Sequence, residues 1–172
     1  MSNRDAFITM ITYSEGTATS PITQNAGWDV IVTGIDGKPE IFTDYSDHPF
    51  AAGRRPKVIN SRGLESTASG GLQILLHEWV YYKKLLNLQD FSRESQIAVG
   101  LQIIKERHAL DLIDEGQFDK AVLQCSNIWA SLPGNNYHQR QNRVALLEKF
   151  YTDAGGILLP PPQEDASDES LA

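Results

Sequence analysis

The sequence predicts an α+β fold in which a mainly helical lobe packs beside a small β-rich lobe, with an active-site cleft between them. Apolar residues recur at helical spacing near the start of the chain and again from residue 70 onward. Between these parts, residues 16–69 are rich in Gly, Thr, Pro, Asp and Asn and contain short β-like runs. A chain of 172 residues fits one such domain. The boundary between two lobes is a natural place for a site.

The first helix is expected over residues 3–14, where apolar side chains such as Ala6, Phe7 and Met10 share one face. Asn3 suits the N-cap of this helix. Gly16 follows directly after Glu15, and a glycine at this place lets the backbone turn away from the helix. The turn leaves the Glu15 carboxyl facing the predicted cleft.

The β-rich part contains two strand-like runs, residues 28–32 and 40–43. Residues 34–39 between them are turn formers, so the two runs predict a hairpin with an unusually long connection. Residues 46–62 lack periodicity and predict an extended loop. Loops of that length inside a domain are usually functional or disordered.

The second half of the chain predicts a succession of helices from residue 70 onward, each with an apolar stripe. Their marker residues are Leu72, Leu75, Leu76, Trp79 and Leu86 for the first, Ser92 as cap of the next, Gly116 as the end of a short one, Phe118 to Cys125 for another, and Val144 to Ala154 for the last. We expect the domain to span residues 1–156. Residues 157–172 carry a proline run and acidic residues without Lys or Arg, and predict a disordered tail.

Composition excludes several classes of function. The net charge of −7 argues against non-specific nucleic-acid binding and against electrostatic attachment to anionic membranes. Cys125 is the one cysteine, so no intrachain disulfide forms, and a reducing compartment is expected. No run is long enough to span a membrane and no signal peptide is recognisable, so we expect neither membrane insertion nor export by a signal peptide.

Glu15 is the candidate catalytic residue, because a partly desolvated carboxyl keeps its proton near neutral pH and can act as a general acid. Residues 66–73 add hydroxyl groups and two glycines directly before a predicted helix. Ser66, Thr67 and Gln73 therefore either hydrogen-bond a carboxyl or a ligand across the cleft or simply cap the helix.

Two further segments are candidates for glycan contacts. Residues 42–49 combine aromatic, acidic and imidazole groups, with Tyr45 and His48 among them, which suits a sugar site; the alternative is a turn rich in Asp and Pro. Residues 127–137 form an aromatic turn that ends at Tyr137, which is either a wall of the cleft or a helix connection with a buried Trp129.

Metal binding is not expected. The four histidines are scattered without ligand spacing, and Tyr81 stands where a zinc-protease helix starting at His77 needs its second histidine. Phosphate-loop and dinucleotide motifs are also missing, so no cofactor is expected.

Several motifs together resemble the lambda-type phage endolysins, which are lytic transglycosylases with a lysozyme-like fold. They are Ser14-Glu15-Gly16, residues 27–32, residues 42–49, residues 66–70 with Gln73, Lys105-Glu106-Arg107 and residues 125–134, in family order over about residues 5–156. Two places depart from the family pattern: Gly71-Leu72 stands where Arg-Tyr is common, and residues 135–138 replace Ala-Gly-Tyr-Gly.

The resemblance implies cleavage of the β-1,4 bond between N-acetylmuramic acid and N-acetylglucosamine in peptidoglycan, with Glu15 as the catalytic acid and no metal. The product would be a 1,6-anhydromuramoyl sugar. Ser66, Thr67, Gln73, Asp29, Tyr45, His48 and Tyr137 are the expected substrate-binding or orienting residues. The resemblance also implies flexible lips near residues 49–60 and 132–141, a monomer in the host cytoplasm, and release to the wall through a separate holin-type pore.

Two alternatives remain at this point. A hydrolytic lysozyme needs a second carboxylate at roughly 5–9.5 Å from the acid, for which Asp29, Asp44 and Asp47 are the candidates. A non-catalytic wall-binding protein on the same fold is the other, although such a protein has no need of a buried acid.

Overall fold

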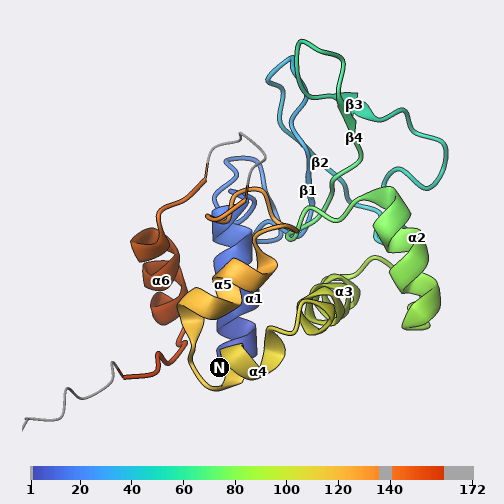
Figure 1. Ribbon diagram of the computed structural model, residues 1–172. Coiled ribbons are helices and arrows are strands. Elements are labelled where there is room, and N and C mark those ends of the chain that lie inside the picture. Colours follow the sequence, from blue (N-terminus) through green and yellow to red (C-terminus); the bar gives the residue numbers. More distant parts are fainter. Residues whose placement is uncertain (1, 136–140, 161–172) are drawn as a thin grey trace, which may run out of the picture.

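Helix α1 (Asn3–Ser14) runs through the centre of the helical lobe in the computed structural model, which describes residues 2–135 and 141–160 (Figure 1). Helices α3 (Arg93–Glu106), α4 (Leu110–Asp114) and α6 (Val144–Asp153) pack against it. Ala6, Phe7, Met10 and Ile11 are fully buried. Because neighbours surround α1, its C-terminal end is held firmly, and Glu15 is the residue at that end.

The bounds predicted for α1 are confirmed, but the predicted N-cap is wrong. Ser2 caps the helix: its hydroxyl accepts the Asp5 N–H at 3.1 Å, and the Asp5 carboxylate accepts the Ser2 N–H at 3.1 Å. This reciprocal pair satisfies two backbone groups at once. The Asn3 amide is then free to bind Ile157, at the far end of the domain.

The β-rich part is made of two short hairpins. Strand β1 (Val30–Ile31) pairs antiparallel with β2 (Glu40–Ile41), which confirms the predicted hairpin with its long connection. Strand β3 (Lys57–Val58) pairs with β4 (Glu65–Ser66). The extended loop predicted over residues 46–62 is confirmed for residues 46–56 and wrong at β3, because strands of two residues are too short to show alternation. The turn between them is stabilised by the Asn60 side chain, which accepts the Arg62 and Leu64 N–H groups.

Helix α2 (Leu76–Leu85) begins later than the apolar stripe predicted. Gly70 has φ +78° and Gln73 has φ +52°, and neither value can continue a right-handed helix. Ser69 instead bridges to Ile31 on one side and to Ile74 on the other. Residues 67–75 thus join the β-rich part to the helices as an irregular, well-anchored segment.

Two buried side chains fix this segment. Gln96 of α3 accepts the Gly71 N–H at 3.0 Å and donates its amide hydrogens to the Trp28 and Phe91 carbonyls. The Trp129 indole, just beyond α5 (Phe118–Cys125), donates to the Leu72 carbonyl at 3.0 Å. Since neither Gly71 nor Leu72 has a strand or helix partner for these groups, the two bonds stabilise an otherwise irregular backbone.

The remaining helices agree with the sequence. Ser92 caps α3, Gly116 follows α4 with φ +74°, and Gly155 follows α6 with φ +84°. The end of the domain extends beyond the predicted boundary, because Ile157 exchanges hydrogen bonds with Asn3 and the Leu159 N–H donates to the Gly116 carbonyl. Residues 161–172, where the acidic tail was expected, lie outside the described residues. In the described part of the chain, no helix is long and apolar enough to cross a membrane.

Candidate active site

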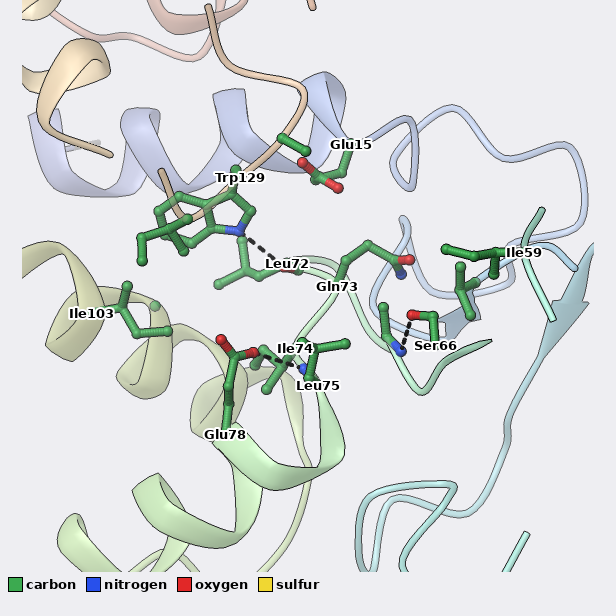
Figure 2. Close-up of a pocket in the computed structure, with 15 residues that line it drawn as sticks. Glu15, Ile59, Ser66, Leu72, Gln73, Ile74, Leu75, Glu78, Ile103 and Trp129 are labelled. Carbon is green, nitrogen blue, oxygen red and sulfur yellow. Dashed lines mark hydrogen bonds between the residues drawn. The ribbon is translucent and has the colours of Figure 1, made fainter. Parts of the chain in front are cut away.

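Glu15 lies where two hollows of the surface meet. The first, of about 290 Å³, is mostly apolar and includes Leu72, Ile103 and Trp129 (Figure 2). The second, of about 440 Å³, is rich in hydroxyl groups such as those of Thr19 and Thr33. The residues that line both are Glu15, Val32 and Gln73. A chain-like ligand that occupies both hollows would therefore pass over the Glu15 carboxyl.

The Glu15 carboxyl is held by Ser131, whose hydroxyl donates to Glu15 Oε1 at 2.6 Å. Part of the side chain reaches solvent, but protein surrounds the carboxyl on most sides. Burial raises the pKa of Glu15, and the hydrogen bonds from Ser131 lower it by less, so that the pKa stays above its usual range. A carboxyl with a raised pKa in a cleft has the property required of a general acid.

Gln73 is oriented toward the same junction by an unusual backbone conformation. Its φ of +52° is uncommon for a residue other than glycine, and such conformations cluster at functional sites. The amide nitrogen of Gln73 donates to the Gly70 carbonyl at 3.0 Å and approaches the Val30 carbonyl at 3.4 Å. Because carbonyls accept hydrogen bonds, this end of the amide is the nitrogen, and Oε1 is the atom left to accept a hydrogen bond from a ligand.

Ser66 and Thr67 have different positions. Ser66 lines the first hollow, and its hydroxyl accepts the Ala68 N–H at 3.1 Å. Thr67 lines neither hollow, and its hydroxyl accepts the Leu76 N–H at 2.9 Å, which caps the start of α2. The capping alternative considered for this segment therefore holds for Thr67. The hydrogen bond to Glu15 comes from Ser131 rather than from either of them.

Asp29, Tyr45 and His48 lie outside both hollows, and their polar atoms bind protein. Asp29 is buried and accepts from Thr23 and from the Gln24 N–H. Tyr45 accepts from the Asn25 amide at 2.8 Å. The buried His48 ring accepts the Phe50 N–H and bonds the Ile74 carbonyl, and burial lowers its pKa, which keeps it neutral. The His48 contacts anchor the loop of residues 42–49, and the Asp29 contacts hold the turn of residues 23–29. The glycan contacts expected for the three residues stay a prediction.

The carboxylates proposed as partners of Glu15 are also absent from both hollows. Asp44 and Asp47 line a separate hollow, and Asp47 binds the Trp79 indole at 2.6 Å and Lys83 at 3.0 Å. Among the described residues that line the two hollows at Glu15, the second carboxylate is that of Glu78 on α2. Figure 2 shows it at the opposite side of the first hollow from Glu15. Its Oε2 accepts the Leu75 N–H at 2.9 Å, so one of its oxygens caps α2.

Sequence reasoning missed Ser131 and Glu78. Ser131 is 116 residues from Glu15 along the chain, and only the fold brings the two together. Its one signal was its place in residues 127–137, the turn that the sequence offered either as a wall of the cleft or as a helix connection. Trp129 is buried and lines the first hollow as well, so both alternatives for it hold. Tyr137 lies outside the described residues.

Known proteins with similar sequences belong to one family. A family model described as Endolysin matches residues 5–158. The endolysin of Escherichia phage P2 is 55% identical over 155 residues, which cover 90% of this chain and 94% of that protein. The endolysin of Escherichia phage lambda is 47% identical over 158 residues, which cover 91% of this chain and 94% of that protein.

This chain belongs to the endolysin family. Among solved structures, it is similar to bacteriophage lambda lysozyme complexed with a chitohexasaccharide, with a TM-score of 0.81 and 46% identity over 92% of this chain and 97% of that one. The fold of this endolysin is therefore lysozyme-like, as the resemblance implied. Family and fold together make it a peptidoglycan-degrading enzyme of the cell-wall-lysing class.

Proposed function

We propose that this endolysin is a lytic transglycosylase, which cleaves the β-1,4 bond between N-acetylmuramic acid and N-acetylglucosamine and closes a 1,6-anhydro ring on the muramoyl sugar. The observation that carries the proposal is the position of Glu15. Its pKa is raised by burial, it lies at the junction of two hollows, and Asp29, Asp44 and Asp47 all lie elsewhere. A single carboxyl of this kind suits a reaction whose nucleophile belongs to the substrate.

The first step uses Glu15 as an acid. The protonated carboxyl donates to the glycosidic oxygen as the bond from that oxygen to C1 breaks, and an oxocarbenium-like transition state develops on the muramoyl sugar. Charge then grows on the carboxylate. The hydrogen bond from Ser131 to Oε1 strengthens as it does so, since bonds to an ionised acceptor are stronger than those to a neutral one.

The second step uses the same residue as a base. Glu15 removes the proton from the C6 hydroxyl of the muramoyl sugar, and that oxygen bonds to C1. The proton returns to the carboxyl, no water is consumed, and the enzyme is ready for the next cycle. One carboxylate suffices because the attacking hydroxyl is already part of the bound sugar.

Gln73 is the residue that we assign to orientation of the sugar at the reacting bond. Its amide nitrogen is occupied by backbone carbonyls, so it presents an acceptor to the ligand. An N–H or a hydroxyl of the sugar is the matching group. Ser66 lines the first hollow and is assigned a second contact with the sugar. The chitohexasaccharide in the complex of the lambda lysozyme supports a β-1,4-linked amino-sugar chain as the ligand class.

A hydrolytic lysozyme is the competing reaction, and Glu78 is the observation that favours it. It lines the same hollow as Glu15 and keeps one oxygen beyond its capping bond to Leu75. In a hydrolase, this carboxylate would activate water or bind C1. Its capping bond and its place at the opposite side of the hollow favour a structural part instead (Figure 2).

Substitution of each carboxylate tests the proposal on purified cell walls. Glu15→Gln keeps the shape and removes the transferable proton, so release of soluble muropeptides should stop. Glu78→Gln should retain activity, because its amide still accepts the Leu75 N–H through the carbonyl end. Full loss of turnover in Glu78→Gln with an unchanged melting temperature would support the hydrolase. Binding to walls without any release by the wild-type chain would support the non-catalytic alternative.

The route to the wall follows from the same proposal. We infer that the protein accumulates as a monomer in the host cytoplasm and passes to the wall through a pore made by a separate holin-type protein. Expression without such a pore should leave intact cells full of active enzyme. Spontaneous lysis of those cells would contradict this route.

A further inference from the structure

A row of hydrogen bonds connects the candidate acid to a residue that the mechanism has not used. The Asn142 amide nitrogen lies 3.0 Å from the Ser14 carbonyl and 3.1 Å from the Ser14 hydroxyl. The Ser14 and Ser131 hydroxyl oxygens are 2.7 Å apart, and Ser131 donates to Glu15 Oε1 at 2.6 Å. The row joins the end of α1, the turn after α5 and the segment that leads into α6.

The orientation of the Asn142 amide is fixed by its surroundings. A backbone carbonyl only accepts hydrogen bonds, so the end of the amide that faces the Ser14 carbonyl is the NH₂ group. The Asn142 backbone N–H also donates to the Ser131 carbonyl at 2.8 Å, which anchors the residue beside the row. The Ser14 hydroxyl oxygen therefore receives a hydrogen from Asn142.

This donor sets the direction of every following bond. Because Ser14 Oγ accepts from Asn142, its own hydrogen is directed to Ser131 Oγ, and the Ser131 hydrogen is directed to Glu15 Oε1. In the reverse direction, a proton on Oε1 would be donated to Ser131, and Ser14 Oγ would accept from both Ser131 and Asn142. The Ser14 hydrogen would then have no acceptor within the row, which leaves a hydrogen bond unmade in a partly buried place.

We propose that Asn142 is a positioning residue that sets the direction of the hydrogen bonds through Ser14 and Ser131, and so keeps the transferable proton of Glu15 on Oε2. The Ser131 hydroxyl donates to Oε1, so Oε2 is the oxygen left to carry the proton. The same oxygen then gives the proton to the leaving group and takes one from the C6 hydroxyl. This inference rests on the proposed role of Glu15, but the direction of the bonds is measurable without catalysis.

Burial is the largest influence on the pKa of Glu15, and the hydrogen bonds from Ser131 come next. Of the described residues that line the two hollows, Glu15 and Glu78 are the titratable ones. On the side of the row, Tyr13 precedes Ser14 on α1, and Arg143 follows Asn142 at the start of α6.

Asn142→Asp tests the proposal because it replaces a donor by an acceptor of nearly the same shape. The Ser14 hydroxyl should then donate to the new carboxylate, Ser131 should donate to Ser14, and Glu15 should lose its donor. We expect the pKa of Glu15, followed by carbon NMR of its carboxyl without substrate, to rise relative to wild type. Activity on cell walls should fall about tenfold in kcat, the low end for loss of a hydrogen bond to a charged group, with little change in KM.

Three companion variants separate this effect from simpler ones. Asn142→Ala removes the donor without a charge and should shift the carboxyl titration less than Asn142→Asp does. In a Ser14→Ala background the row of hydrogen bonds is interrupted. The rise in the pKa of Glu15 caused by Asn142→Asp should then shrink to the part that comes from the added negative charge alone. Asn87→Asp, at the far end of α2, adds the same charge elsewhere and should leave the titration unchanged.

Equal shifts in Asn142→Asp and Asn142→Ala, or an undiminished shift in the Ser14→Ala background, would overturn the proposal. Melting curves of each variant show whether the fold is retained. If Asn142→Asp does not fold, Asn142→Ala takes its place. An unchanged pKa of Glu15 in Asn142→Ala would then also overturn the proposal. If the titrations follow the prediction while Glu15→Gln still degrades walls, the row exists and the proposed function is wrong.

Discussion

Replacing Ser131 by Ala removes the hydrogen bond that its hydroxyl donates to Glu15 Oε1 over 2.6 Å. A hydrogen bond to a charged group contributes about 1.5–3 kcal/mol, which corresponds to a rate factor of roughly 10 to 150. Ser131 is only half-buried, so a water molecule can take part of its place. We therefore expect Ser131→Ala to lower kcat about tenfold, near the lower end of that range.

The pH dependence of the same variant has a definite sign. Burial raises the pKa of Glu15, and the Ser131 hydroxyl opposes that rise. Without the hydroxyl, the pKa of Glu15 should rise further, so the acid form persists to higher pH. The alkaline limb of the kcat profile should consequently move to higher pH, while KM changes little because the lost bond does not touch the substrate.

The assay is the initial rate of wall clearance, measured as a function of pH and of wall concentration. Ser92→Ala is the matched control, because it also removes a serine hydroxyl that accepts a backbone N–H at the start of α3. It should cost about 1 kcal/mol of stability and leave the kcat profile in place. An unchanged kcat in Ser131→Ala, or an alkaline limb that moves to lower pH, would refute the reasoning.

Three further predictions concern stability. Glu15 is harder to ionise in the folded state, so wild-type stability should fall as pH rises from the ordinary carboxyl range through the raised pKa of Glu15. Glu15→Gln should therefore melt at a higher temperature than wild type at neutral pH. Melting curves at several pH values test this, because the difference should vanish in acid. Gly71→Ala should lower the free energy of unfolding by about 1–3 kcal/mol in denaturant titrations and should lower kcat, because its Cβ would lie 2.7 Å from the Trp28 ring. Wild-type stability together with wild-type kcat would contradict the close contact between Gly71 and Trp28. Deletion of residues 157–172 should lower the melting temperature by several degrees through lost hydrogen bonds, whereas deletion of residues 161–172 should not, and equal melting of the two truncations would contradict the contacts.

Helix periodicity and end signals made the helical lobe predictable. The bounds of α1, the cap at Ser92 and the terminating glycines follow from local chemistry that acts within a few residues. The β3–β4 hairpin escaped prediction because its strands have two residues each and its turn depends on the Asn60 side chain. The irregular path of residues 67–75 escaped for another reason: Gln96 and Trp129, distant in sequence, satisfy its backbone.

The candidate site was predictable only in part. Glu15 stood out because the adjacent glycine lets the backbone turn toward a cleft and because the neighbouring segments resemble endolysin motifs. Its partner Ser131 did not stand out, because a serine in a turn has many ordinary roles. His48 and Asp29 were expected to contact the sugar, whereas the bonds that the structure shows for them are to protein: Asp29 accepts the Gln24 N–H, and His48 bonds the Ile74 carbonyl.

The mass of the products released from purified peptidoglycan tests the central claim most directly. An intramolecular reaction through Glu15 yields muropeptides that end in a 1,6-anhydromuramoyl sugar, which is lighter by one water than the hydrolytic product. We predict the anhydro mass for the wild-type protein and for Glu78→Gln, and no product for Glu15→Gln. Products with the hydrolytic mass would contradict the account and would direct attention to Glu78 as the second carboxylate of a lysozyme.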